Sequence, residues 1–191
     1  MASIVVAGDT SGTVTLSAPA VSGTTTLTLP TTSGTVLTSA SSVVSSQLPV
    51  GSVLQVVNAV TAVQVSANSG TYVDTGLTAT ITPSSASSKI LVLVDQTGCG
   101  KATNDTTLQL KLLRGSTDLM WLERSGAWTA SSAHNFIGSC SCNFLDSPGT
   151  TSAVTYKTQQ ASFNGGATVY TQFNVGSGLP TSTITLIEIK A

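Results

Sequence analysis

Apolar and polar residues alternate along much of the chain, which is the pattern of β-strands that bury one face. The clearest run is Leu108-Gln109-Leu110-Lys111-Leu112, where leucine occupies every second position. Residues 90–94 and 184–189 instead carry apolar side chains on both faces. Strands of this second kind are either central in a sheet or covered by a neighbouring subunit. No segment shows a sustained helical period, so the pattern predicts an all-β fold.

Clusters of glycine, proline and serine separate the alternating runs and mark turns between strands. The sequence predicts strands over residues 52–65, 72–82, 89–96, 106–114, 118–123, 134–145, 153–160, 167–173 and 182–190. Eight or nine strands in about 140 residues are typical of a jelly roll. Residues 98–101 are expected to form a hairpin turn, and residues 121–133 fit a loop or one helical turn as well as a strand.

The first forty residues repeat with a period of eleven. Ser11-Gly12-Thr13-Val14-Thr15-Leu16 is followed by Ser22-Gly23-Thr24-Thr25-Thr26-Leu27 and then by Ser33-Gly34-Thr35-Val36-Leu37-Thr38. Each unit reads as a Ser-Gly turn before a short strand, and such units cannot bury a core alone. The repeat therefore predicts an extended β arm that pairs with other chains, with a disordered arm as the alternative.

Charge divides the chain into two parts. Asp9 is the single charged residue before Asp74, after which charges occur at ordinary surface spacing. A Ser/Val-rich segment over residues 39–47 leads into Leu48-Pro49-Val50-Gly51, where proline and glycine punctuate the chain. We therefore predict an N-terminal extended β-repeat arm over residues 1–46, followed by a jelly-roll-like antiparallel β-sandwich over residues 47–191.

Composition argues against several functional classes. The net charge is -1 and the seven basic residues form no stripe, so we expect no nucleic-acid partner. No apolar run approaches the roughly 20 residues that span a bilayer, so no membrane partner is expected. Cys99, Cys140 and Cys142 are predicted to be reduced thiols, and with a single histidine they offer a poor zinc set. We expect no metal and no cofactor.

Candidate catalytic residues are few. A Ser-His-Asp arrangement would depend on His134 alone, because it is the one histidine of the chain. Asp118 and Glu123 are the nearest acidic pair, and the paired carboxylates of glycoside hydrolases are the relevant precedent. We expect this pair to share charges with Arg114 and Arg124 on a solvated loop. The sequence therefore does not predict an enzyme.

Aromatic residues are scarce, yet both tryptophans fall within residues 120–128. Exposed tryptophan beside arginine is typical of interaction hot spots, and tryptophan also stacks on sugar faces. Trp121, Arg124 and Trp128 are therefore candidate partner-binding residues for a subunit or a glycan. The alternative is that both tryptophans anchor their loop to the core.

The chain also resembles a known family of virus proteins. The N-terminal part resembles the arm of tailed-phage virion proteins common among marine and freshwater phages, including cyanophages, in Ile4-Val5-Val6-Ala7-Gly8-Asp9-Thr10-Ser11-Gly12, residues 16–19, Thr25 to Pro30 and residues 33–37. The remainder is similar to the distal domain of phage fibres in residues 48–57, 76–91, 113–117, 144–148 and 182–189. These modules occur both in tail fibres and in head-decorating proteins.

The resemblance implies a homotrimeric, non-enzymatic protein of the virion surface, assembled in the host cytoplasm. Our leading hypothesis is a head-decoration or cement protein bound to the major capsid protein or other virion proteins, because about forty arm residues leave no long shaft. A receptor-binding tail fibre or adhesin that contacts host surface glycan is the alternative. The arm could form a β-prism, a β-helix or strands added to a partner. Candidate attachment residues in the arm are Thr13, Val14, Leu16, Thr26, Leu27, Leu29, Val36 and Leu37.

Overall fold

The computed structural model describes residues 3–7, 10–17, 23, 24, 26, 31, 33, 42–174, 176, 178 and 180–191. The chain divides into two compact units, Met1–Ser42 and Val43–Ala191. The boundary that we predicted after residue 46 falls inside the second unit, before its first strand.

The described part of the first unit contains an antiparallel hairpin of β1 (Ser3–Ala7) and β2 (Thr13–Ser17). Gly12 lies directly before β2 with φ +82°, a conformation that glycine adopts without steric cost. The first predicted Ser-Gly turn and strand are therefore present. An isolated two-stranded hairpin is at best marginally stable in water, so this hairpin is expected to need further contacts.

The candidate attachment residues divide between described and undescribed positions. Thr13, Val14 and Leu16 belong to β2, and Thr26 is described and exposed. The remaining candidates lie outside the described residues: Leu27, Leu29, Val36 and Leu37. The role of all eight residues in attachment stays a prediction.

The second unit is built almost entirely from strands. A short 3-10 turn, η1 (Ser45–Gln47), precedes them. The strands are β3 (Val53–Thr61), β4 (Val65–Ala67), β5 (Val73–Ile81), β6 (Lys89–Lys101), β7 (Thr106–Arg114), β8 (Thr117–Thr129), β9 (Asn135–Asp146), β10 (Val154–Ser162), β11 (Val169–Thr171) and β12 (Ser182–Ile189). The predicted all-β fold is confirmed.

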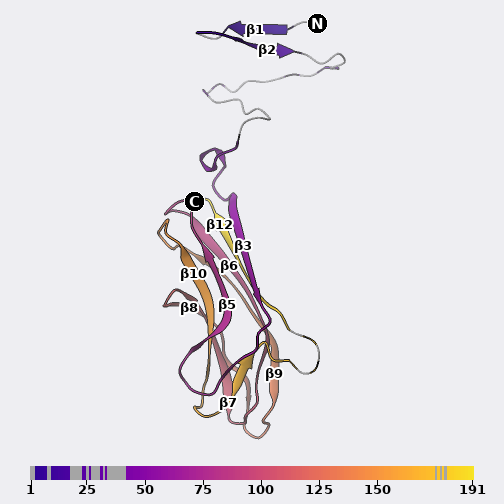
Figure 1. Cartoon of the computed structure of the whole chain (residues 1–191), viewed down its shortest axis with the longest axis vertical. Helices are drawn as coiled ribbons and strands as arrows, with labels where there is room; N and C mark the ends of the chain where they lie inside the picture. The colour runs from indigo at the N-terminus through magenta and orange to yellow at the C-terminus, as the bar shows by residue number, and fades with distance from the viewer. Residues whose placement is uncertain are drawn as a thin grey trace. The chain divides into compact units, whose positions relative to one another are not determined.

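Eight long strands form two antiparallel sheets that pack face to face (Figure 1). One sheet has the order β3-β12-β6-β9, and the other has the order β5-β10-β7-β8. Numbered along the chain, these orders are 1-8-3-6 and 2-7-4-5, which is the strand arrangement of a jelly roll. The short strands β11 and β4 extend the first sheet beside the last residues of β6.

The core lies between the sheets because alternate positions of each strand point inward. In β7, Leu108, Leu110 and Leu112 are buried while Gln109 and Lys111 face outward, as the alternation predicted. The larger apolar cluster joins Leu77, Ala79, Ile81, Ile90, Val92, Val94, Leu112, Val154, Tyr156, Ile184 and Leu186. The smaller cluster joins Ala67, Cys99, Leu108, Leu110, Cys140 and Val169.

A buried polar group connects the sheets between these two clusters. The Gln96 side chain accepts a hydrogen bond from Thr158 Oγ1 at 2.7 Å and donates one to Ser182 Oγ at 3.3 Å. Thr158 Oγ1 also lies 2.5 Å from Thr75 Oγ1. Since a buried polar group without a partner is costly, this network fixes how the sheets align.

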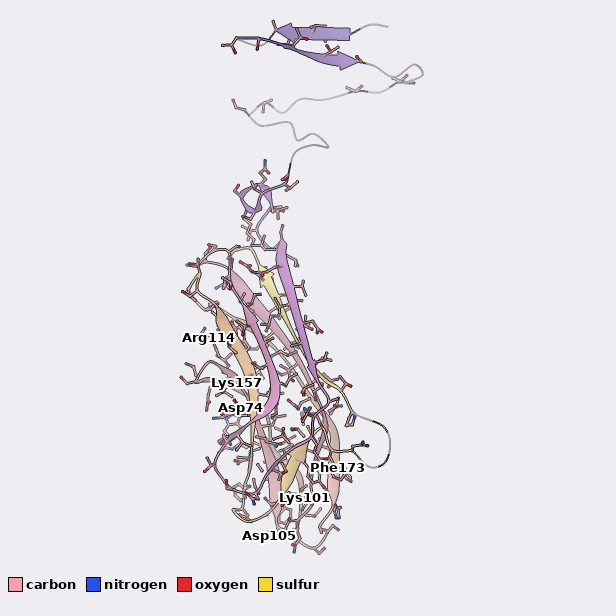
Figure 2. All side chains as sticks on the ribbon, viewed as in Figure 1. Asp74, Lys101, Asp105, Arg114, Lys157 and Phe173 are labelled. Carbon is pink, nitrogen blue, oxygen red and sulfur yellow. The ribbon has the colours of Figure 1, made fainter. Side chains whose placement is uncertain are left out.

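A second polar link joins the sheets near one end of the sandwich. Asp146 of β9 accepts a hydrogen bond from Tyr156 Oη at 2.6 Å and forms an ion pair with Arg114 Nη1 at 2.8 Å. Tyr156 and Arg114 belong to the opposite sheet, and Figure 2 labels Arg114 far from Lys101 and Asp105. Burial and the hydrogen bond to Asp146 raise the pKa of Tyr156, so its hydroxyl stays protonated.

The structure corrects two predicted segments. Residues 98–101 form the end of β6 and not a hairpin turn, because β6 continues its pairing with β9 through two register shifts. Gly98, with φ +61°, provides the backbone conformation of that irregular stretch, and a Cβ there would lie 2.5 Å from Phe173 N. The ambiguous residues 121–133 are strand as far as Thr129, since β8 pairs with β7 along that length.

The Glu188 side chain, near the end of β12, connects this strand to β3 and to the turn between β5 and β6. Its carboxylate accepts hydrogen bonds from the Ser84 backbone N–H at 2.7 Å, Ser84 Oγ at 2.6 Å and Gln55 Nε2 at 2.5 Å. Burial alone would raise the pKa of Glu188, but these hydrogen bonds outweigh it and hold the pKa below its ordinary value. The charged form is therefore stabilised by folding.

We predict that Glu188→Gln destabilises the protein at neutral pH by about 1–3 kcal/mol, because an amide cannot accept from both Ser84 and Gln55. The native carboxylate has a lowered pKa, so its contribution is fully present above the unfolded pKa of about 4.3 and is lost as pH falls toward the folded value. Urea unfolding of both proteins between pH 7 and pH 3 should show the difference shrinking below about pH 4.3. A difference that does not change with pH would contradict this account.

Candidate functional site

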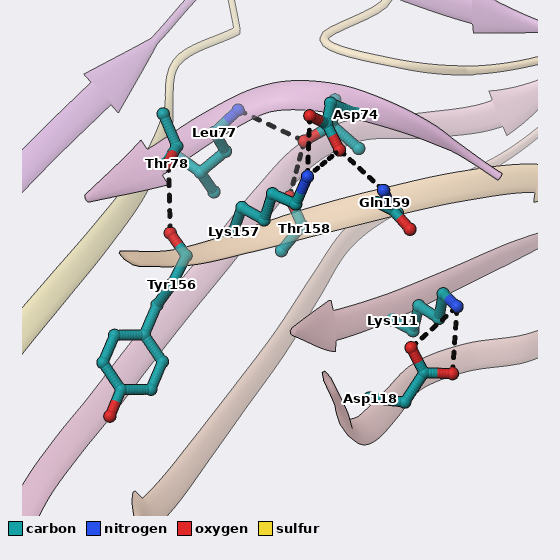
Figure 3. Close-up of polar contacts among 10 residues, drawn as sticks. Asp74, Leu77, Thr78, Lys111, Asp118, Tyr156, Lys157, Thr158 and Gln159 are labelled. Atoms are coloured by element: carbon teal, nitrogen blue, oxygen red, sulfur yellow. Dashed lines mark hydrogen bonds and ion pairs between the residues drawn. The ribbon is translucent and has the colours of Figure 1, made fainter. Parts of the chain in front are cut away.

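The outer face of the β5-β10-β7-β8 sheet is polar and internally paired. Lys157 forms an ion pair with Asp74 at 2.8 Å, and Lys111 forms one with Asp118 at 2.8 Å (Figure 3). Gln159 Nε2 also donates to Asp74 Oδ1 at 2.7 Å. Such exposed pairs contribute little stability, but they are typical of a face in contact with water.

The outer face of the β3-β12-β6-β9 sheet carries one complete aliphatic row, whereas the next two rows are mostly polar, with Asn58, Thr185 and Asn143 in one and Thr183, Asp95 and Ser141 in the other. The strand register brings Val56, Ile187, Leu91 and Leu145 into one row across all four strands. The exposed fraction of Val56 is 57 %, and that of Leu145 is 56 %. We call the following residues the aliphatic face: Val53, Val56, Val60, Leu91, Leu93, Leu145, Ile187 and Ile189.

Two charged residues lie among those of the aliphatic face, Lys89 in the row of Ile189 and Asp95 in the row of Val60, and both are hydrogen-bonded. Lys89 Nζ donates to Ser147 Oγ at 2.7 Å, and Asp95 accepts from Ser141 Oγ at 3.0 Å.

The sequence left open whether the strands with apolar residues on both faces are central in a sheet or covered by a neighbouring subunit. β6 and β12 are central in their sheet, and their outward apolar side chains are partly exposed in the single chain.

Trp121 lies in a row of aromatic and cationic side chains on the polar sheet. Its ring makes an edge contact with Tyr72 at a centroid distance of 5.9 Å, and the Arg124 guanidinium lies 5.0 Å from its centroid. Lys111 Nζ lies 4.0 Å from the Tyr72 centroid. The structure therefore brings Trp121 and Arg124 together as a cation–π pair.

Arg124 and Trp128 line one pocket of about 240 Å³ on the outside of β7 and β8. Phe163, which directly follows β10, provides a second aromatic wall. The exposed fraction of Trp128 is 53 % and that of Phe163 is 60 %, and neither belongs to the apolar clusters. The other lining residues are Thr107, Gln109 and Ser125.

The sequence had suggested part of this pocket. Arg124 and Trp128 line it, whereas Trp121 lies behind Arg124 and is not a lining residue. Phe163 and Gln109 were missed, because residue 163 comes beside Thr107 of β7, and so into the same pocket as residues of β8, only through the pairing of β10 with β7. The signal available in the sequence was an apolar aromatic residue, Phe163, next to the turn Asn164-Gly165-Gly166.

A second cavity of about 250 Å³ lies beside η1 and is lined mostly by serines. Its cation, Lys190, donates to the backbone carbonyls of Ser46 and Leu48. Ser84 Oγ is taken by Glu188, and Ser85 and Ser87 bond to one another. This cavity therefore presents few unengaged polar groups to a ligand.

An aromatic stack at the other end of the sandwich anchors the loops there. Tyr170 and Phe173 stack at a centroid distance of 4.2 Å, and Phe136 stacks on Phe173 at 5.3 Å. Lys101 is buried nearby and donates to the Thr129 carbonyl at 3.0 Å. Burial lowers the pKa of Lys101. These contacts hold the end of β8 against β6 and β11.

The candidate catalytic residues do not assemble. His134 Nδ1 lies 3.4 Å from Tyr170 Oη, which is its one recorded side-chain contact within the described residues. Asp118 pairs with Lys111, while Glu123 accepts from the backbone N–H groups of Arg124 and Ser125. The prediction that Arg114 pairs with Asp118 or Glu123 is wrong, since Arg114 pairs with Asp146.

The remaining candidate sites concern cysteines, metals and membranes. Cys99, Cys140 and Cys142 are free, and the first two are buried. No group of three or more potential metal ligands occurs in the part of the chain that the structure describes. Over the same residues, no helix is long and apolar enough to cross a bilayer. No model of a known protein family matches the chain, and a search among curated proteins finds no match either.

Proposed function

We propose that this protein is a structural subunit of a virus particle, which forms a homotrimer and attaches to other virion proteins through its N-terminal unit. The observation that carries the proposal is the aliphatic face, whose row Val56, Ile187, Leu91 and Leu145 crosses four strands of one sheet, while the opposite sheet carries ion pairs on its outer face. The jelly roll also supports it, because viral capsid domains commonly use this fold. Head decoration remains the leading assignment.

Further copies of the chain are the occupants that suit the aliphatic face. Four strands about 4.8 Å apart and about 25 Å long give a plan area on the order of 500 Å². A stable interface buries roughly 800 Å² per partner, so the turns beside this face would contribute to the contact as well. Permanent interfaces between like subunits have apolar centres and a more polar surround, and the row of Val56, Ile187, Leu91 and Leu145 beside polar rows has this arrangement.

The N-terminal hairpin supports the attachment role. Within the described residues its two strands pair only with each other, and Ile4, Val5 and Val6 are exposed. Extended segments of this kind bind by adding strands to a sheet of a partner, where backbone hydrogen bonds provide much of the affinity. In this proposal the partner is the major capsid protein or another protein of the particle.

Leu145→Glu is predicted to convert the trimer to a monomer, because the charge would be buried without a partner in the subunit interface. Leu145 is exposed in the single chain, so the fold should be retained, as circular dichroism can verify. Light scattering after gel filtration measures the mass directly. Thr80→Glu on the polar sheet is the matched control and should leave the trimer intact. A native protein with the mass of one chain would refute the proposed trimer.

Removing residues 1–38 is predicted to leave the second unit folded but unable to bind virus particles. The second unit has its own core, whereas the hairpin that provides exposed strand edges is lost. Co-sedimentation of full-length and truncated protein with particles that lack this subunit compares the two. Equal binding of both proteins would show that the N-terminal unit does not attach the protein.

A further inference from the structure

The cations of this chain are almost all engaged within the fold. All seven lysine and arginine residues are described, and six of them donate to carboxylates, hydroxyls or backbone carbonyls. These six are Lys89, Lys101, Lys111, Arg114, Lys157 and Lys190. Within the described residues, the Arg124 guanidinium has no hydrogen bond or ion pair. It is therefore the cation available to an external anion.

The Arg124 guanidinium is positioned by a cation–π contact, without a hydrogen bond to the described residues. The guanidinium lies 5.0 Å from the centre of the Trp121 ring, and Trp121 is in turn packed against Tyr72. A cation–π contact takes up no N–H donor of the guanidinium, so a carboxylate can still bind it with two hydrogen bonds. The contact with Trp121 therefore orients the guanidinium and leaves its N–H donors available to a carboxylate.

The pocket beside Arg124 presents aromatic faces and a free amide donor. Trp128 and Phe163 form exposed aromatic walls, and no other ring is recorded stacking on either of them within the described residues. Gln109 Oε1 accepts a hydrogen bond from Tyr72 Oη at 2.8 Å, which leaves Gln109 Nε2 as a donor. Aromatic faces pack against the C–H groups of a pyranose ring, and amides donate to its hydroxyls.

We propose that this pocket binds one carboxylated sugar unit of a glycan, with the carboxylate on Arg124 and the ring against Trp128 and Phe163. The cavity of about 240 Å³ is smaller than the roughly 300–1,000 Å³ of most ligand sites, which suits a single ring. A nucleic acid is a poorer match, because one free cation cannot neutralise several phosphates. The site goes beyond the structural role and does not depend on the proposed trimer.

The experiment measures binding to the full-length protein by ligand-observed NMR. The probes are methyl β-D-glucuronoside, free D-glucuronate, methyl β-D-glucoside and inorganic phosphate. We expect saturable binding of the glucuronoside, with at least about tenfold weaker binding of the glucoside because it lacks the carboxylate, a difference worth about 1.4 kcal/mol. Free glucuronate should bind comparably, since the glycosidic methyl group makes no required contact.

Single substitutions test the carboxylate contact and the sugar-ring contact separately. Arg124→Gln should abolish the preference for glucuronoside over glucoside, and Trp128→Ala should weaken both sugars at least about tenfold. Trp128→Phe retains an aromatic face and should restore most of the loss. Lys89→Gln removes the same charge from the other sheet and should change nothing. Because Trp128 and Arg124 are exposed, thermal unfolding should confirm that these variants are folded.

Several results would overturn the proposal. They are the absence of saturable glucuronoside binding, unchanged binding in Arg124→Gln and Trp128→Ala, and phosphate binding as tight as that of the sugar acid. Binding of free glucuronate but not of its glycoside would identify a site for a free metabolite instead of a glycan. The mass of each sample, measured by light scattering, distinguishes failure of this site from failure of the trimer.

Discussion

The rest of the structure depends on the packing of two four-stranded sheets over one shared layer of side chains. That layer requires an apolar residue at every second position of eight strands, and apolar side chains meet the requirement over most of the sandwich. Where it is polar, Gln96 and Asp146 form hydrogen bonds across the sheets. Since buried polar groups must be paired, these two residues fix the alignment that apolar packing alone would leave looser.

Packing of the inner layer leaves the two outer faces free to differ. The polar sheet satisfies its charges internally through pairs such as Lys157 with Asp74. The other sheet presents aliphatic side chains such as Val56 and Leu145, which gain nothing from contact with water. A jelly roll with one face of each kind is suited to assembly through the aliphatic face and to external contacts through the polar one. Trp128 and its pocket lie on the polar side.

Local patterns in the sequence predicted the strands better than the site. The alternating leucines of residues 108–112 identified β7 correctly, because the period of two is a local property. The glycines at positions 98 and 100 misled the prediction, since glycine serves an irregular pairing as readily as a turn. Trp128 and Arg124 were found from composition. Phe163 stands beside a turn in the sequence, but its place in the pocket could not be predicted, because it follows from the pairing of β10 with β7.

Hydroxyl-radical footprinting of the full-length protein tests the central claim most directly, because it reports which outer face is covered in solution. With rates normalised to each residue's intrinsic reactivity, the account predicts that Leu93 and Leu145 are protected despite exposed fractions of 38 % and 56 % in the single chain. Trp128 and Phe163 should react at the rates their exposure implies. Labelling of Leu93 and Leu145 at full exposed rates would contradict assembly through the aliphatic face.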